Sequence, residues 1–374
     1  LVSSCTVEPV VTNITVTPTN FTLDAIGDTA QLTATVTAQD GRPLPSVTVT
    51  WASDNAAATV SASGLVTAVA NGTARVTATA NGTSGAATIT ISQQVDNLAK
   101  TGGDGQTGEV GTALATALGA RANDRLGNPV AGVNVVFSVS AGGGSVATGV
   151  VTTPAAGTAS TTWTLGRVAG ATQAVTASAQ GKTASFGATA TRGPADSLVK
   201  VSGDNQFAPA STAATDSLVV RVADRFGNPV PGHAGTFAVT QGGGSVSPTN
   251  ATTGANGRAA TRFTLGATGG AQNTAQATAS GVTTGSPATF TATALSGTVA
   301  VFEGNNQTGL VGFGVNVAPA IRVVDQNNQP LLGLVVTFAV PSGGGSVTGG
   351  STTTGANGVA RGGEWTLGLA AGAN

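Results

Sequence analysis

Five aspartates recur at matching positions of the chain, and together they could supply oxygen ligands to a cation. They fall into two sets, spaced by 100 or 101 residues: Asp104 and Asp204, and Asp124, Asp224 and Asp325. Carboxylate oxygens are ligands that Ca²⁺ prefers, so neighbouring repeats that brought such groups together would bind this ion. The spacing differs from the Asp-x-Asp-x-Asp calcium loop, and aspartates in turns commonly accept hydrogen bonds from backbone amides. We therefore expect turn capping, with Ca²⁺ as the alternative and no other cofactor.

The remaining reactive side chains do not form a catalytic constellation. The chain has a single His, His233, a single Cys, Cys5, and no Tyr, so neither a Ser-His-Asp nor a Cys-His arrangement can be assembled. We expect His233 to be a surface residue. The triple glycine at 142–144 lacks the Gly-Lys-Ser/Thr of a phosphate-binding loop. We expect no enzyme activity and neither catalytic nor cofactor-binding residues.

Composition excludes further classes of protein. Charged residues make up 8% of the chain, the net charge is −1, and the 15 Lys and Arg residues are dispersed. Nucleic-acid binding requires clustered cations, so we expect no such partner. No apolar run approaches the roughly 20 residues of a membrane helix. With 40% hydrophobic residues and 55 Gly, the sequence instead favours short strands joined by tight turns.

Three sequence markers repeat in the same phase along the chain. Each marker occurs in three copies: DRLGNPV (124–130), DRFGNPV (224–230) and DQNNQPL (325–331); GGGSV (142–146, 242–246 and 343–347); and WTLG (163–166), FTLG (263–266) and WTLG (365–368). A unit of about 100 residues matches the size of one β-sandwich domain. The chain is therefore predicted to be a tandem array of all-β domains.

The first marker predicts a turn between two strands. Gly and Asn tolerate positive φ angles and Pro fixes its own, which suits a tight turn. Alternating apolar and polar residues precede it, as at 217–222, and follow it, as at 133–139. We expect these two runs to be neighbouring antiparallel strands of one sheet.

Aromatic residues recur at two positions of the repeat and are predicted to fill the cores. The first position holds Phe137, Phe237 and Phe338; the second, expected on the opposite sheet, holds Trp163, Phe263 and Trp365; in residues 6–92, which lack the triple-glycine and WTLG markers, Trp51 takes this role. One buried aromatic removes about 150–250 Å² from water, so two per domain can anchor a core without a disulfide. An exposed aromatic binding stripe is the alternative.

Two resemblances follow from these motifs. Residues 29–91 resemble a bacterial Ig-like domain of group 2, through the runs QLTATV (31–36), VTWASD (49–54), ATV (58–60), GLVTA (64–68) and GTARVTA (72–78). The three later units resemble the group 1, invasin/intimin-type Ig-like domains, through the DRxGNPV turn, the strand after it, and TGANG at 253–257 and 354–358, where the second unit reads TPAAG instead. The resemblance implies tandem immunoglobulin-like β-sandwiches, and the short links between them predict that they are arranged as an extended rod.

The expected domain boundaries follow the repeats. We predict an N-terminal lead at 1–5, a group 2 domain at 6–92, and group 1 domains at 93–193, 194–295 and 296–374. The run VSSC at 2–5 resembles the lipobox of bacterial lipoproteins, which would make Cys5 a lipid anchor; an unmodified cysteine in a flexible lead is the alternative. The last unit stops before its final strands, so we expect either a truncated fragment or completion by another chain through strand addition.

The resemblance implies a non-catalytic protein of the bacterial cell surface, acting as a structural stalk or adhesin. Its partner would be a protein or glycan on a host or neighbouring cell, or further copies of itself, with membrane attachment only through a lipid anchor at the outer membrane. Two alternatives remain open at this point. The chain could be an accessory or carbohydrate-binding region of a larger secreted enzyme, or a subunit of an extracellular filament assembled by strand donation.

Overall fold

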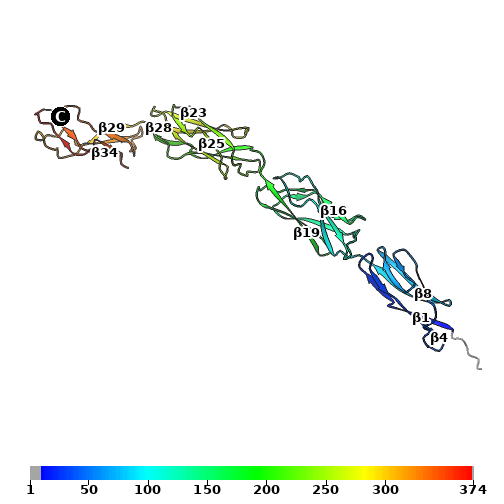
Figure 1. Ribbon diagram of the computed structural model, residues 1–374. Coiled ribbons are helices and arrows are strands. Elements are labelled where there is room, and N and C mark those ends of the chain that lie inside the picture. The colour runs from blue at the N-terminus through cyan, green and yellow to red at the C-terminus, as the bar shows by residue number, and fades with distance from the viewer. Residues whose placement is uncertain (1–9, 373–374) are drawn as a thin grey trace, which may run out of the picture. The chain divides into compact units, whose positions relative to one another are not determined.

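The chain forms β-strands joined by turns, as Figure 1 shows for this computed structural model. The structure describes residues 10–372, and these contain no helix. Accordingly, no helix among these residues could span a membrane. The chain divides into two compact units, with the boundary between Thr191 and Arg192 in the sequence. The fold is therefore all-β, as predicted.

Strand pairing divides the chain into four segments, because each strand pairs only with strands of its own segment. The first segment, residues 10–91, has a four-stranded sheet β2-β9-β8-β5, a three-stranded sheet β3-β7-β6 and the pair β1-β4. Its strands are β1 Val11–Thr17, β2 Asn20–Leu23, β3 Thr29–Gln31, β4 Thr33–Ala38, β5 Thr50–Ser53, β6 Ala58–Val60, β7 Leu65–Ala68, β8 Gly72–Ala80 and β9 Thr83–Ile91.

The second segment, residues 97–191, has a five-stranded sheet β11-β19-β18-β13-β15, a three-stranded sheet β10-β12-β16 and the pair β14-β17. Its strands are β10 Asn97–Gly102, β11 Gln106–Glu109, β12 Leu118–Asn123, β13 Asn134–Ala141, β14 Ser145–Val146, β15 Val150–Thr152, β16 Thr158–Thr161, β17 Trp163–Thr164, β18 Thr172–Ala179 and β19 Lys182–Thr191.

The third segment, residues 197–295, repeats this arrangement with sheets β21-β28-β27-β23-β25 and β20-β22-β26-β24. Its strands are β20 Ser197–Ser202, β21 Gln206–Pro209, β22 Leu218–Ala223, β23 Ala234–Gln241, β24 Ser245–Ser247, β25 Asn250–Thr252, β26 Arg258–Thr264, β27 Gln272–Ala279 and β28 Ala288–Leu295. In each of the first three segments one early strand runs parallel to the last strand: β2 to β9, β11 to β19 and β21 to β28.

The fourth segment, residues 298–366, has smaller sheets: β29-β30-β34, β31-β33 and β32-β35. Its strands are β29 Thr298–Glu303, β30 Ala320–Val324, β31 Val335–Thr337, β32 Ser346–Val347, β33 Ser351–Thr353, β34 Val359–Arg361 and β35 Trp365–Thr366. Within the described residues β31 pairs only with β33, whereas β13 and β23 each pair with a second, long strand as well.

One sequence prediction about the repeat turn is wrong. The strands on either side of the DRLGNPV turn, β12 and β13, lie in different sheets and do not pair. After the turn the chain folds back briefly, with the Val130 N–H donating to the Ala122 carbonyl at 2.9 Å, and then crosses to the other sheet. Both strands contribute buried side chains, such as Leu118 and Ala120 of β12 and Val135 and Phe137 of β13, but they do so from different sheets.

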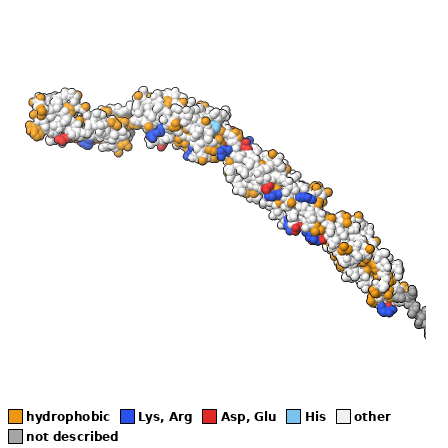
Figure 2. Space-filling view, in the orientation of Figure 1, with side chains coloured by type: hydrophobic (Ala, Val, Ile, Leu, Met, Phe, Trp, Pro, Cys, Tyr) orange, Lys and Arg blue, Asp and Glu red, His pale blue; other side chains and the backbone are white. Residues whose placement is uncertain are grey.

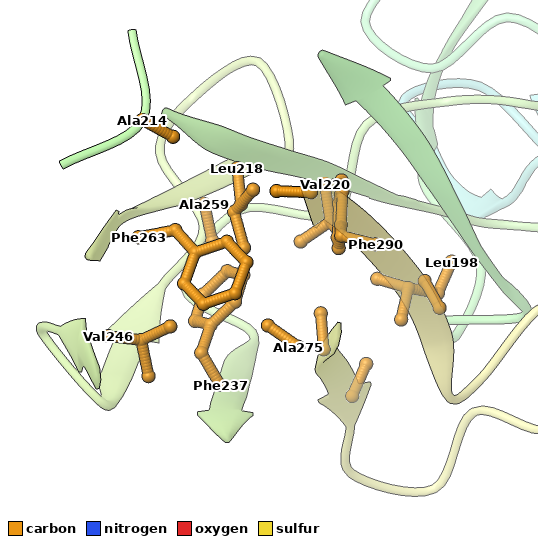
Figure 3. Packing of buried hydrophobic residues seen from close by; sticks show 14 of the residues in the cluster. Leu198, Ala214, Leu218, Val220, Phe237, Val246, Ala259, Phe263, Ala275 and Phe290 are labelled. Carbon is orange, nitrogen blue, oxygen red and sulfur yellow. The ribbon is translucent and has the colours of Figure 1, made fainter. Parts of the chain in front are cut away.

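The core of the third segment lies between its two sheets. Leu218, Val220 and Val222 point inward from β22, and Ala275 and Ala277 do so from β27 of the opposing sheet. Val219 and Arg221 of β22, and the Gln and Thr residues of β27, occupy the alternate, more exposed positions, which is the period of two expected for a half-buried strand. Figure 3 shows this cluster, with side chains of both sheets converging on the rings of the central aromatic residues.

Candidate functional site

The carboxylate of Asp124 is the best-built polar site in the second segment. The residue is 1% exposed. Its Oδ1 accepts hydrogen bonds from the backbone N–H groups of Leu126 at 3.0 Å and Asn128 at 2.9 Å, which caps the turn. Its Oδ2 accepts from the Ile26 N–H and from Gln93 Nε2, both at 3.0 Å. Each oxygen is therefore already bonded to N–H donors.

The equivalent aspartates cap their own turns in the same way. Asp224 Oδ1 accepts from two backbone N–H groups of its turn, each at 2.9 Å, and its Oδ2 accepts from the Gly193 N–H at 3.0 Å. Asp325 Oδ1 accepts from the N–H groups of Asn327 and Gln329, both at 2.8 Å. These contacts are the ones expected of turn-capping carboxylates.

Asp104 and Asp204 form a second structural set, at the start of the parallel strands β11 and β21. Asp104 forms an ion pair with Lys100 and accepts a hydrogen bond from the Gly187 N–H at 2.9 Å. Asp204 forms an ion pair with Lys200 and accepts from the Thr291 N–H at 2.9 Å. Both aspartates therefore tie the loop before an early strand to the last hairpin of their segment.

The structure does not gather these aspartates into a cation site. Among residues 10–372 no group of three or more His, Cys, Asp or Glu side chains could hold a metal ion. Asp124, Asp224 and Asp325 accept from uncharged N–H groups, and Asp104 and Asp204 are each paired with a Lys, so these bonds satisfy the carboxylates without a metal ion. The described contacts thus favour turn capping over calcium coordination.

The capping bonds also shift the acidity of these groups. Burial raises the pKa of Asp124, but hydrogen bonds from Gln93, Asn128 and Ile26 together outweigh it, so the pKa lies below its ordinary value. Asp224 behaves alike: burial raises its pKa, and bonds from Asn228 and Gly193 bring it below the ordinary value. The hydrogen bond from Lys100 lowers the pKa of Asp104. These carboxylates stay ionised at neutral pH and are unsuited to proton transfer there.

The predicted core aromatics divide into two groups. Four of them are at most 2% exposed: Phe137 of β13 and Trp163 of β17 in the second segment, and Phe237 of β23 and Phe263 of β26 in the third. Trp51 packs against the core of the first segment but stays half-buried. In Figure 3, Phe237 of β23 and Phe263 of β26 lie together in the middle of the cluster.

Phe338 and Trp365 are only half-buried and do not complete a core. With Pro319, Val340 and Val347 they line an apolar cavity of about 180 Å³. In the second and third segments a long strand, β18 or β27, pairs with the strand that carries the equivalent of Phe338. Among the described residues the fourth segment has no such strand, which leaves these rings partly uncovered.

Several residues with repeated structural roles were not predicted from the sequence. Phe186 and Phe290 are at most 1% exposed in the cores of the second and third segments. They are 104 residues apart, so extra residues before Phe290 break the 100-residue phase that could have revealed them. The buried side chains of Gln173 and Asn273 were missed too; each accepts a hydrogen bond from the glycine of a WTLG or FTLG marker.

The close approach of two markers explains their glycines. A Cβ added at Gly166 would lie 1.8 Å from the Gly142 carbonyl oxygen, and one added at Gly266 would lie 1.7 Å from that of Gly242. Only glycine permits backbones to come this close. The triple-glycine loop and the WTLG strand end are thus parts of one packing arrangement.

The other predicted positions are outside any site. His233 is half-buried, where the chain crosses between sheets, and its backbone N–H donates to Thr253 Oγ1 at 2.9 Å. Cys5 lies outside the described residues. On the face shown in Figure 2 charged side chains are scattered, and most of the surface is uncharged. No acid, base and nucleophile are brought together by the contacts found within residues 10–372.

Comparison with solved structures finds many similar chains. FdeC, an adhesin of Escherichia coli, is 21% identical over 75% of this chain and 96% of its own, with a TM-score of 0.34. Invasin, described as a bacterial integrin-binding protein, is 17% identical over 91% of this chain and 73% of its own, with a TM-score of 0.39. Domains 4–9 of the surface layer protein SbsC are 17% identical over 87% and 55%, with a TM-score of 0.25.

No curated protein matches the sequence. The family model of the bacterial Ig-like domain (group 2) matches residues 10–91. These are the residues that form β1 to β9 around one core cluster. The first segment is therefore a bacterial Ig-like domain of group 2, as its sequence predicts.

Proposed function

We propose that the chain is a non-catalytic protein of a bacterial cell surface, in which tandem Ig-like domains form a structural stalk or adhesin. The observation that carries this proposal is the set of hydrogen bonds made by the recurring aspartates. Every repeated aspartate accepts hydrogen bonds from backbone N–H groups of its own segment. The repeats therefore preserve a scaffold rather than a reactive site. The partner in this proposal is a protein or glycan on another cell.

The domains of the proposed stalk are residues 6–92, 93–193, 194–295 and 296–374. Strand pairing supports this division, since within residues 10–372 no sheet extends from one segment into the next. The connections between the sheets of adjoining segments are short: Ile91 to Asn97, Thr191 to Ser197, and Leu295 to Thr298. Short connections limit how far adjoining domains can bend without making every junction equally stiff, so we propose an extended rod of about 150 Å, from four sandwiches of about 40 Å each.

Small-angle X-ray scattering on the purified full chain tests the rod. A thin rod of that length has a radius of gyration of about 43 Å, whereas a compact globule of 374 residues has one of about 21 Å. A value near 21 Å would refute the stalk. The cellular location is tested separately, by protease treatment of intact cells of the bacterium that encodes the chain. Loss of the antibody signal without lysis supports surface exposure, and full retention contradicts it.

A second candidate function is suggested by the edge of β31 in the fourth segment. Among the described residues β31 pairs on one side only, and Phe338 and Trp365 beside it line an apolar cavity. A strand from another copy would cover both features, as in filaments assembled by strand donation. Electron microscopy of concentrated protein distinguishes the two: filaments favour donation, and separate short particles at all concentrations count against it.

A further inference from the structure

The turn at 124–128 reaches from the second segment to the loop that follows β2 in the first. Both backbone groups of Ile26 are engaged: its N–H donates to Asp124 Oδ2 at 3.0 Å, and its carbonyl accepts from Asn128 Nδ2 at 2.8 Å. Asp124 is 1% exposed, so these bonds are shielded from competing water. Bonds to a charged carboxylate are also stronger than those between neutral groups. We call this arrangement the clasp.

Three further contacts support the clasp. Arg125 forms ion pairs with Asp24 and Asp28, which flank Ile26 in the same loop. Their side chains are mostly half-exposed, so the ion pairs orient the loop more than they stabilise it. Gln93, in the connection between the segments, donates to Asp124 Oδ2 at 3.0 Å. The loop, the connection and the turn therefore converge on one carboxylate.

The junction between the third and fourth segments is built differently from the one between the first and second. The position of Ile26 corresponds to Ala210, because the Thr212 N–H donates to the Pro209 carbonyl as the Asp28 N–H does to Ala25. The Ala210 N–H, however, is already bonded to the Leu295 carbonyl at 3.1 Å within its own segment. The Ala210 N–H is therefore not available to bond the turn of the fourth segment, as the Ile26 N–H bonds Asp124.

The turn of the fourth segment has also lost the groups that would reach across. Gln326 and Gln329 stand where Arg125 and Asn128 stand in the second segment. Gln326 Oε1 accepts a hydrogen bond from the Ser296 N–H in the adjoining connection, at 3.1 Å. Among residues 192–372, no hydrogen bond joins the turn at 325–329 to the loop at 209–213.

We propose that the clasp locks the first and second domains into one rigid piece, and that the junction before the fourth domain is a hinge. This device concerns the mechanics of the chain and does not depend on where the protein acts. A fourth domain on a hinge samples a wider range of orientations relative to the third, while the first and second domains keep theirs relative to each other. The two junctions thus differ in stiffness because of which backbone donors the preceding domain leaves unbonded.

Distance measurements by pulsed electron–electron double resonance on the spin-labelled full chain test this proposal. Cys5→Ser removes the native thiol, and labels at exposed positions are introduced as Thr59→Cys with Thr183→Cys, or as Thr249→Cys with Ser351→Cys. We expect the distance distribution across the hinge pair to be at least twice as wide as that across the clasp pair. Equal widths would overturn the proposal.

Two variants probe the clasp itself. Asn128→Ala removes the bond to the Ile26 carbonyl, and the double variant Asp24→Asn, Asp28→Asn removes the partners of Arg125 without altering the turn. Each is expected to widen the first distribution at least 1.5-fold while leaving the hinge pair unchanged. Asn256→Ala, in a turn of the third segment, is the matched control and should change neither. If both clasp variants remain folded by circular dichroism and the first distribution stays narrow, the clasp does not supply the rigidity.

Discussion

Replacing Phe263 by Ala should destabilise the third domain selectively. Phe263 is fully buried between the sheets, where Phe237, Leu218 and Val246 surround it (Figure 3). The substitution leaves a cavity that the stiff strands around it can close only in part. Phe207→Ala is the matched control, because Phe207 belongs to the same segment and is 65% exposed.

The expected magnitude follows from the buried area. An aromatic side chain removes about 150–250 Å² from water, which at about 25 cal/mol per Å² corresponds to roughly 4–6 kcal/mol. Because the unfolded chain already buries part of this area, about 3–5 kcal/mol remains, which is also the range measured for Phe→Ala in other cores. A single domain has only about 5–15 kcal/mol of stability, so the loss is a large fraction of it.

Hydrogen exchange followed by mass spectrometry can measure this loss domain by domain in the full chain. Each 1.4 kcal/mol is a factor of ten, so amides of β27 should exchange about 100- to 4000-fold faster in Phe263→Ala. Amides of β18, in the second segment, should keep their rates, and Phe207→Ala should change neither set by more than a few-fold. If β18 and β27 lost protection together, the two segments would share one cooperative core, and the modular description of the chain would be wrong.

Three further outcomes are expected. Gly266→Ala places a Cβ 1.7 Å from the Gly242 carbonyl oxygen, so thermal unfolding should show that the third domain loses about 2 kcal/mol or more of stability. Gly254→Ala is the control and should change the stability little, because its Cβ would lie 3.7 Å from the nearest atom. The melting temperature should be the same in calcium as in EDTA, because the repeated aspartates are bonded to N–H donors. A rise of several degrees in calcium would show a specific native-state site. The folded-state pKa values of Asp124 and Asp224 are lowered, so the stability they contribute is complete above the ordinary pKa near 4 and is lost as the pH falls through the lower folded values. Acid titration of the unfolding free energy should show this loss in wild type and a smaller one in Asp224→Asn, and an identical acid profile in the two proteins would contradict the assignment.

The sequence alone determined the composition-level and local features of this protein. Alternating Thr, Val and Ala residues at Gly-rich intervals specify strands and turns because side chains of a strand alternate between faces. The repeat phase located the turn aspartates, and the group 2 resemblance over residues 29–91 is confirmed by the family match to residues 10–91. These features are local, or recur at a fixed spacing, so a single sequence is enough to reveal them.

The tertiary structure decided how those elements meet. The turn at 124–130 could not reveal that its two strands belong to opposite sheets, because alternation marks a buried face without naming the sheet that carries it. Likewise, nothing near Gly266 in the sequence indicates that it touches Gly242. The bonds that Asp124 and Asn128 make with Ile26 depend on an N–H that the preceding domain leaves unbonded, which is a property of its hydrogen-bond pattern and not of residue type.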